Sequence, residues 1–461
     1  MPFLLLVLGM CVQCEPKEDI AKRPNVIFIL TDDLGAGDLG VTGHPYAQTP
    51  NIDKLANEGI RFTKAYMSAA WCAPSRYALM RGLHPAREFY ESYDLDPAQP
   101  SITSILQKSG YATAHIGKWH LANNTVDSPA PAAFGIDVPI TTSSPKAAWS
   151  GKESQTKEFR ANSTERYVDL AIDFIEENHE KPFYINLWVQ PTHSYIDPSD
   201  EQLRVYDGLK VDLKDFKNPQ QRQFLEFVSQ YGDINESMQA YCADLTALDT
   251  ALGRLFSFLK MAGIDQNTIV VFSSDNGPGP LTSQVKNQSV AGRYRERPTL
   301  LNSVGSAGEF GERKLSVKDG GTRVPFIVRW PAQISEGSVD NKTVLSGLDW
   351  LPTIAALTNT ELPPETGFDG QDMSRAFTGS PVDRNSPLLW YESNGHSAVL
   401  VDQWKGTITD GNFHLYNIEN DPGEVADLKN IENQKAREVE DILRAWMAQV
   451  PVPKAKVVRK K

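Results

Sequence analysis

The feature that most constrains the fold of this chain is the alternation of short apolar runs with longer amphipathic segments. Five runs have the length and composition of buried strands, at 26–30, 111–116, 183–189, 268–273 and 324–329. Helical patterns lie between them, at 51–58, 102–109, 164–178 and 236–261. Strands that alternate with helices predict an α/β fold with a large, mostly parallel sheet between layers of helices.

The C-terminal part of the chain has a different pattern. Short strand-like runs at 388–391, 398–401 and 413–416 surround a turn at 410–412, and a helical pattern at 432–449 precedes a basic tail at 454–461. A length of 461 residues also exceeds what one hydrophobic core usually holds. We therefore predict a large domain over 23–382 and a small α+β domain, with a short antiparallel sheet, over 383–461.

The N-terminus predicts export. Residues 2–10 are nearly all apolar and 15–22 are polar, which is typical of a leader and is too short to span a bilayer. We assign 1–22 to a leader and linker, and expect a periplasmic or extracellular protein with no transmembrane helix. The segment ending at Cys11 weakly resembles a lipoprotein cleavage box, so a lipid anchor on Cys11 and a plain cleaved signal both remain open.

The overall charge excludes one class of partner. Acidic residues outnumber basic ones by 58 to 46, which gives a net charge of -12. Nucleic-acid binding depends on a basic face that displaces counterions from phosphates, so we expect no nucleic-acid partner. An acidic protein of this kind can bind an anion only in a local pocket of cations or beside a metal.

Polar side chains follow four of the predicted strands. They are Asp32 and Asp33 after the first, Lys118 and His120 after the second, His193 after the third, and Asp275 and Asn276 after the fourth. Each has an ordinary alternative, since acidic pairs and Asp-Asn-Gly are common in turns and a lone histidine is commonly a surface residue. Ligands of open parallel sheets bind beyond the carboxyl ends of the strands. Their joint placement therefore predicts one site.

Four of these residues form a candidate cation site. Asp32, Asp33, Asp275 and Asn276 would supply only oxygen atoms, which suits a hard divalent cation rather than zinc. We favour calcium over magnesium, because close carboxylates and an amide tolerate its larger and less regular shell. A metal that only braces the fold, or no metal at all, remains the alternative.

The segment Cys72-Ala73-Pro74-Ser75-Arg76 is the sharpest local signal. A proline in the first turn predicts a helix that begins at Cys72, with the cysteine at the positive end of the helix dipole. Arg76 would lie one turn later on the same face. The spacing differs from the C-x5-R loop of cysteine phosphatases and excludes that mechanism. An ordinary buried cysteine at a helix start is the alternative.

This segment resembles the C-x-P-S-R signature of the type I, formylglycine-dependent sulfatases, an arylsulfatase-like family with the alkaline phosphatase superfamily fold. Residues 110–121 resemble the second signature of the family. The resemblance extends through 32–35, 275–277, Lys314 with 319–325, and 416–428, in the order of the family. It spans nearly the whole mature chain and implies that 23–382 is the catalytic domain.

The resemblance implies that a formylglycine-generating enzyme oxidises Cys72 to formylglycine. The aldehyde is hydrated to a diol, which attacks sulfur and later expels sulfate by breaking a carbon–oxygen bond. The implied metal ligands are Asp32, Asp33, Asp275, Asn276 and the modified Cys72 side chain.

The resemblance also implies roles for the other polar residues. Arg76 would hold the hydrated aldehyde, and Lys118 and Lys314 would bind sulfate oxygens. His193 would act as general acid and His120 as base. The chain departs from the family pattern at Asp319, where glutamate is usual, and at 195, where a proline usually follows the histidine.

Three functions remain open at this level. A sulfatase that acts on a sulfated carbohydrate or another sulfate ester fits best. A phosphatase or phosphonate-ester hydrolase on the same fold and an inactive glycan-binding protein are the alternatives. Arg293, Arg295 and Arg297 would suit a polyanionic glycan, or would form a solvated loop. The sequence leaves open the particular substrate, endo or exo action, and the oligomeric state.

Overall fold

An eight-stranded sheet forms the centre of the computed structural model, in the order β4-β3-β5-β1-β6-β7-β2-β8. The structure describes residues 23–453 apart from 123–127, 150–151, 195, 282–300, 335–336 and 365. The predicted leader with Cys11, the basic tail 454–461 and the three arginines 293, 295 and 297 lie outside the described residues. The strands are β1 (Asn25–Thr31), β2 (Ile60–Tyr66), β3 (Ala112–Lys118), β4 (Val138–Thr142), β5 (Phe183–Trp188), β6 (Thr268–Ser274), β7 (Phe326–Arg329) and β8 (Ser338–Ser346).

The prediction of a mixed, mostly parallel sheet is confirmed, with one strand reversed. Strand β7 runs antiparallel to both β6 and β2, and every other neighbouring pair is parallel. The strands β2, β4 and β8 were not predicted. Each is partly exposed along its length, so none of the three has the continuous apolar run that marks the buried central strands.

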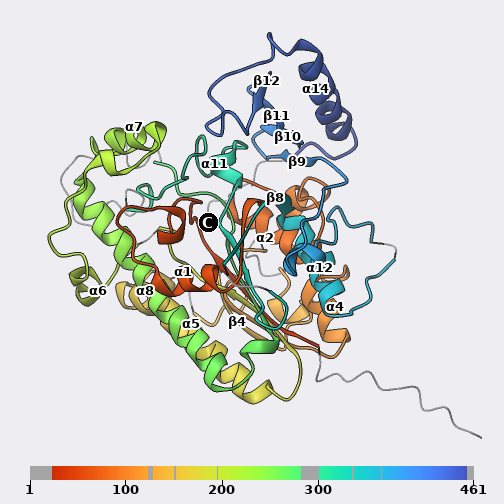
Figure 1. Cartoon of the computed structure of the whole chain (residues 1–461). Coiled ribbons are helices and arrows are strands. Elements are labelled where there is room, and N and C mark those ends of the chain that lie inside the picture. Colours follow the sequence, from red (N-terminus) through yellow and green to blue (C-terminus); the bar gives the residue numbers. More distant parts are fainter. Residues whose placement is uncertain are drawn as a thin grey trace, which may run out of the picture.

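Helices cover both faces of this sheet, because the side chains of the central strands alternate between two hydrophobic cores (Figure 1). Ile27 and Ile29 of β1 contribute to a core with α1 (Pro50–Asn57), α5 (Lys157–Asn178) and α8 (Ile234–Met261). Val26, Phe28 and Leu30 contribute to the other core, with α2 (Cys72–Arg81), α4 (Ile102–Lys108) and α12 (Trp350–Leu357). The remaining helices are α3 (Phe89–Ser92), α6 (Asp200–Arg204), α7 (Pro219–Val228), α11 (Asp319–Thr322) and α13 (Ser374–Phe377).

The C-terminal segment forms a separate antiparallel sheet, as predicted. Its order is β12-β11-β10-β9, from β9 (Leu388–Tyr391), β10 (Ser397–Val401), β11 (Trp404–Thr409) and β12 (Asn412–Asn417). The helix α14 (Asn433–Met447) packs on one face, and the other face packs on Tyr66 and Val317 of the large unit. Strand β11 was not predicted. The domain boundary at 382/383 stays a prediction.

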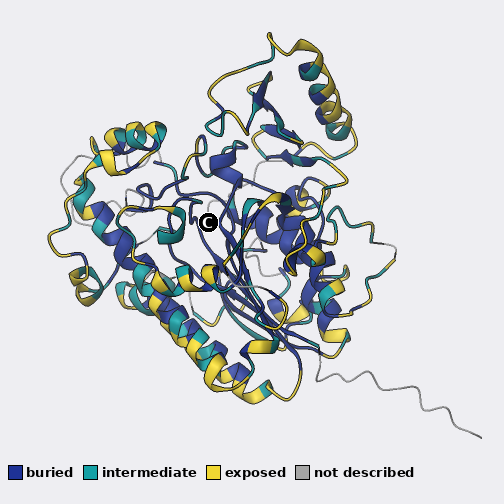
Figure 2. Ribbon diagram, viewed as in Figure 1, coloured by how far each residue is buried: buried dark blue, intermediate teal, exposed yellow. Residues whose placement is uncertain are grey.

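Burial follows this layered arrangement. Figure 2 shows the central strands dark throughout, whereas the outer helices carry exposed residues on one side only. Among the described residues, no helix combines the length and the apolar character that crossing a membrane requires.

Candidate active site

The carboxyl ends of four adjacent strands meet at one edge of the sheet. Strands β3, β5, β1 and β6 are neighbours and all run in the same direction. The residues predicted after these strands are therefore brought to the same edge. Asp32, Asp33, Asp275 and Asn276 are all buried there, and Lys118 is nearly so.

Cys72 reaches this edge from α2, which begins at the cysteine as predicted. The thiol donates to Asp32 Oδ1 at 3.1 Å, and its Sγ lies 3.8 Å from Asp33 Oδ1. The Lys314 ammonium donates to the same sulfur at 3.2 Å. Burial raises the pKa of Cys72 well above its ordinary value, and Asp275 and Asp32 add to this effect. The unmodified thiol therefore stays protonated in spite of its position at a helix N-terminus.

Arg76 lies one turn further along α2 and is fully buried. Its Nε donates to Asp275 Oδ2 at 2.9 Å, and its Nη1 donates to the Lys118 backbone carbonyl at 3.1 Å. Burial raises the pKa of Asp275 to about 6 even though Arg76 opposes the shift. Arg76 thus joins the residues that follow β6 to the end of β3, one helical turn beyond Cys72.

Two lysines give each carboxylate of the Asp32–Asp33 pair its own counter-charge. Lys118 Nζ lies 2.5 Å from Asp32 Oδ2, and Lys314 Nζ lies 2.5 Å from Asp33 Oδ1. Burial lowers the pKa of both lysines, but the neighbouring carboxylates and Cys72 outweigh it, so both pKa values end above the ordinary one. Two ammonium groups therefore flank the thiol, which is the arrangement that an anionic substrate group requires.

The loop that carries Lys314 is fixed by backbone hydrogen bonds on both sides. Lys314 N–H donates to the Pro278 carbonyl at 3.1 Å, and Leu315 N–H donates to the Ala70 carbonyl at 2.8 Å. Gly277 lies so close to this region that a Cβ there would approach the Gly320 carbonyl oxygen to 1.9 Å. This close approach explains why glycine follows Asp275 and Asn276 in the sequence.

The two predicted histidines come from the loops that follow β5 and β3. His193 Nε2 is 3.9 Å from Asp33 Oδ2, and about a third of its side chain is exposed. Burial lowers the pKa of His193 to about 4, with Asp32 opposing the shift. His120 lies two residues beyond the end of β3 with a φ of 57°, and its N–H donates to the Ser143 carbonyl.

The residues present fit a hard cation. Ligand atoms of Asp32, Asp33, Cys72 and His193 all lie within 4.8 Å of one another. Asn276 Oδ1 is buried and has no hydrogen-bond partner among the residues that the structure describes, while its Nδ2 donates to Asp33 Oδ1 at 2.8 Å. An unpartnered buried carbonyl oxygen is costly, and a cation at this point would satisfy it.

His193 lies in this group although it was not predicted as a ligand. Asp275 lies at the same edge, where its Oδ1 accepts from Asp33 N–H at 3.2 Å and its Oδ2 accepts from Arg76 Nε. The ligand set that includes Asp275 stays a prediction.

Sequence reasoning missed a carboxylate that holds the segment before Cys72. Glu392 follows β9 in the small sheet and is buried. It accepts hydrogen bonds from Ala70 N at 2.7 Å, Trp71 Nε1 at 3.0 Å and Tyr90 OH at 3.0 Å. Nothing in the local sequence marks Glu392, because it lies more than 300 residues from its partners. The small sheet thus contributes a side chain to the edge of the large sheet where Cys72 and the predicted ligands meet, which we call the catalytic edge.

Arg160 of α5 was also missed. Its Nη2 donates to the His193 backbone carbonyl at 2.5 Å, and its Nη1 donates to the Gln190 side chain. The loop between β5 and His193 is therefore held by a helix that covers the sheet. The spacing between residues 160 and 193 gives no signal of this contact.

Asp319, the departure from the family pattern, lies away from the thiol in a buried ion cluster. It accepts from Tyr66 OH at 3.0 Å and from Lys405 Nζ at 2.6 Å, and its own N–H donates to Glu424 at 2.6 Å. Because Lys405 and Glu424 belong to the C-terminal unit, the shorter carboxylate joins the two sheets.

A family model described as Sulfatase matches residues 24–360, which is most of the chain. The chain belongs to the sulfatase family. It is therefore a sulfuric ester hydrolase, as the resemblance implied.

Curated relatives agree with this assignment. The chain is 28% identical over 428 residues to N-acetylgalactosamine-6-sulfatase of Mus musculus, covering 83% of this chain and 72% of that protein. It is 25% identical over 540 residues to N-acetylgalactosamine-6-O-sulfatase of Bacteroides thetaiotaomicron, covering 96% and 97%.

Solved structures share the fold of this sulfatase. A protein studied in the metabolism of multiple glycosaminoglycans by Bacteroides thetaiotaomicron has a TM-score of 0.73 at 22% identity, covering 93% of this chain and all of that one. A structure in complex with its substrate D-glucosamine-2-N,6-O-disulfate has a TM-score of 0.70 at 22% identity, covering 93% and 98%. At these identities the likeness concerns the fold.

Proposed function

We propose that this sulfatase hydrolyses a sulfate monoester of a carbohydrate, with formylglycine made from Cys72 and a calcium ion. The observation that carries the proposal is the convergence of Lys118 and Lys314 on Cys72 beside a carboxylate pair. A sugar substrate is supported by two N-acetylgalactosamine-6-sulfatase relatives and by the neighbour in complex with D-glucosamine-2-N,6-O-disulfate.

The cation would be held by Asp32, Asp33, Asp275, Asn276 and the modified side chain of residue 72, with the second oxygen of Asp275 held by Arg76. When bound, calcium would neutralise charge on the sulfate group and favour ionisation of the attacking hydroxyl. Magnesium is the less favoured ion, because the ligand atoms include a mixed set of carboxylate and amide oxygens in an irregular arrangement.

Each remaining side chain has a task that its position supports. Lys118 and Lys314 would bind sulfate oxygens from two sides and offset the charge that develops during transfer. Arg76 would hold the hydrated aldehyde at residue 72 and offset the charge beside it. His193 would protonate the departing sugar oxygen, and His120 would accept a proton in the later step.

The alternatives share this fold. Phosphonate monoester hydrolase of Agrobacterium radiobacter has a TM-score of 0.65 at 17% identity, a likeness in fold alone. A phosphatase or phosphonate hydrolase would release phosphate or phosphonate in preference to sulfate. An inactive glycan-binding protein would release neither product.

The first experiment is the mass of the tryptic peptide 65–76 after expression with a formylglycine-generating enzyme. Conversion of the Cys72 thiol to an aldehyde lowers the mass by about 18 Da, and a Cys72→Ser variant is the matched control. Sulfate release from sulfated mono- and oligosaccharides is then measured beside phosphate release from 4-nitrophenyl phosphate. An unmodified thiol in a competent host, or a preference for phosphate, would overturn the proposal.

We also propose that the protein is exported through the leader at 1–22, with 23–382 as catalytic domain and 383–461 as C-terminal domain. The N-terminal peptide of the mature protein distinguishes the two leader hypotheses. A lipid-modified Cys11 indicates an anchor, and an unmodified new N-terminus indicates a plain cleaved signal.

A further inference from the structure

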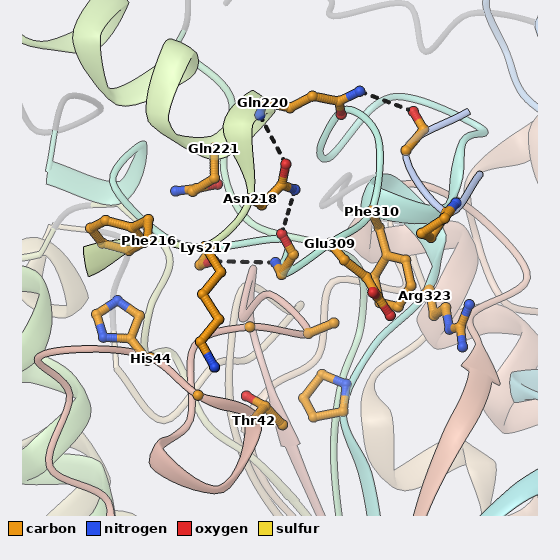
Figure 3. A pocket seen from close by; sticks show the side chains of 18 of the residues that line it. Thr42, His44, Phe216, Lys217, Asn218, Gln220, Gln221, Glu309, Phe310 and Arg323 are labelled. Carbon is orange, nitrogen blue, oxygen red and sulfur yellow. Dashed lines mark hydrogen bonds between the residues drawn. The ribbon is translucent and has the colours of Figure 1, made fainter. Parts of the chain in front are cut away.

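A cavity of about 850 Å³ lies beside the catalytic edge and shares none of its proposed catalytic or metal-binding residues (Figure 3). Its size is that of a site for a ligand larger than one sugar. Its walls come from six segments, at 36–45, 61–63, 216–221, 306–310, 323–325 and 422–425.

The charged groups of the cavity favour an anion. Arg61 and Lys217 line it, and neither side chain has a hydrogen bond or ion pair within the described part of the chain. Figure 3 shows Lys217 extending from the start of α7 toward Thr42. Glu309 is the one carboxylate of the described lining, so the wall is locally cationic in a protein of net charge -12.

The cavity also has surfaces that suit the faces and hydroxyls of sugars. Phe216 and Phe310 line it from two sides (Figure 3), and Arg323 lies over the Phe310 ring at 4.2 Å. The amides of Asn218 and Gln220 form part of the same wall. Aromatic rings beside amides and cations are a combination that binds charged carbohydrates.

Hydrogen bonds between the segments hold the cavity open. Asn218 Nδ2 donates to the Gly308 carbonyl at 2.6 Å, and Gln220 Nε2 donates to the Gly423 carbonyl at 3.3 Å. Gly37 N–H donates to the Ser306 carbonyl at 2.9 Å. These bonds join the start of α7 to the segments 306–310 and 422–425, and the segment 36–45 to 306–310. The cavity is therefore formed before a ligand binds.

Two of the walls continue directly into the proposed active site. Ala36 follows Asp33 closely, and Phe310 precedes Lys314 closely. A chain of three or four residues spans at most about 14 Å, so both walls lie within that distance of the catalytic groups. A flexible polyanion of several sugars covers such a distance, whereas a monosaccharide does not.

We propose that this cavity binds anionic sugar residues of the same oligosaccharide whose sulfate ester is cleaved at the catalytic edge. The inference rests on the proposed function and adds that this sulfatase prefers oligosaccharides to monosaccharides. Arg61 and Lys217 contact sulfate or carboxylate groups of the distant residues, and the two phenylalanines contact their ring faces.

The test uses full-length Cys72→Ala protein, which is inactive and keeps the cavity. Hexasaccharides of chondroitin 6-sulfate, heparin and κ-carrageenan, and inorganic sulfate alone, are titrated by calorimetry into this protein. The same titrations use a cavity variant, which carries Arg61→Gln and Lys217→Gln in addition. We expect at least one hexasaccharide to bind about tenfold more weakly to the cavity variant. Lys210→Gln with Arg375→Gln, two exposed residues outside the cavity, gives the same change in net charge and serves as control.

Several results would overturn the proposal. They are equal affinities of the cavity variant and the control for every hexasaccharide, no binding of any hexasaccharide, and a loss of affinity confined to inorganic sulfate. The last result would assign the cavity to a small anion.

Turnover separates this inference from the proposed function. With Cys72 intact, the cavity variant is expected to keep the kcat/KM of wild type for 4-nitrophenyl sulfate and to show a higher KM for the bound hexasaccharide. Failure of wild-type protein to cleave any sulfate ester would contradict the proposed function, while the calorimetric comparison would still decide the role of the cavity.

Discussion

Asp32 and Asp33 are adjacent in sequence, yet each has its own counter-charge. Lys118 pairs with the first and Lys314 with the second, and these lysines lie far apart in the sequence. Burial would raise the pKa of Asp32, but Lys118, His193 and Arg76 outweigh it and hold the pKa well below its ordinary value. A carboxylate that stays anionic at this point is what a divalent cation requires.

Removal of the Asn276 side chain is expected to weaken calcium binding. The Asn276→Ala variant lacks the buried Oδ1, which has no hydrogen-bond partner within the described part of the chain, so one proposed oxygen ligand is lost. We expect a loss of about 10- to 100-fold in calcium affinity. It is measured as a smaller calcium-dependent rise in Tm, since an ion that binds only the native state stabilises it by mass action. An unchanged calcium response would exclude Asn276 as a ligand.

Asp244 of α8 is expected to make stability depend on pH. Its carboxylate is buried near Arg160, its Oδ2 has no hydrogen-bond partner among the described residues, and burial raises its pKa to about 7. The native protein therefore keeps a proton that the unfolded chain loses near pH 4, and stability falls as the pH rises from about 4 to 7. This shift corresponds to about 4 kcal/mol over that range.

The Asp244→Asn variant lacks this titration. Its free energy of unfolding is expected to rise relative to wild type between pH 4 and pH 7, in urea titrations across that range. At each pH, the free energy of unfolding of wild type is subtracted from that of the variant. Only the change of this difference with pH is interpreted, so any constant effect of the substitution cancels. A difference that does not vary with pH would contradict the assigned pKa.

At the scale of elements, the site depends on contacts between a loop and the helix or sheet that covers it. The β5 loop is held by Arg160 of α5, and the segment before α2 is held by Glu392 of the small sheet. Short loops at strand ends have few contacts of their own, so such distant side chains decide their geometry.

Loss of the Arg160 guanidinium is expected to lower kcat more than it raises KM. Arg160→Gln removes the hydrogen bond to the His193 carbonyl, and the imidazole then loses its fixed position on the leaving-group side. We expect a decrease of about tenfold or more in kcat for an alkyl sulfate ester, and a smaller decrease for 4-nitrophenyl sulfate, whose leaving group needs less protonation. Arg254→Gln, in the exposed pairs with Glu165 and Asp169, is the control. Equal losses on both substrates would indicate a structural role alone.

At the scale of the whole molecule, a buried ion cluster joins the two sheets. Lys405 of β11 lies 2.6 Å from Asp319 Oδ1 and 3.6 Å from Glu424 Oε1, and all three side chains are buried. Burial raises the pKa of Glu424 to about 8, against the effect of Lys405. Lys405 and Arg323, which lies 3.1 Å from Asp319 Oδ2, supply the positive charge of this cluster.

The Lys405→Met variant is expected to lose about 3–5 kcal/mol of unfolding free energy, because the buried pair is broken and Asp319 keeps only Arg323 as a counter-charge. Denaturant unfolding measures the loss. Lys64→Met, which removes the exposed pair with Glu419, is the matched control and is expected to lose at most about 1 kcal/mol. Similar losses for the two variants would show that the buried cluster does not hold the sheets together.

Much of the fold follows from local sequence. The continuous apolar runs of β1, β3, β5 and β6 have that composition because both faces of these strands are buried, so pattern alone located them. Strand β2 alternates buried and partly exposed residues. Its pattern, like those of β4 and β8, resembles the pattern of surface segments, and these strands are recognised only when their neighbours are in place.

The sequence by itself determined the buried strands of the large sheet and the candidate residues at their ends, because hydrophobic periodicity and short motifs are local. It also predicted the helix that begins at Cys72. Only the tertiary structure decided the strands β2, β4 and β8, the reversed direction of β7, and the supports from Arg160 and Glu392. These depend on contacts between residues far apart in sequence, whose partners are selected by packing and by the need to neutralise buried charge.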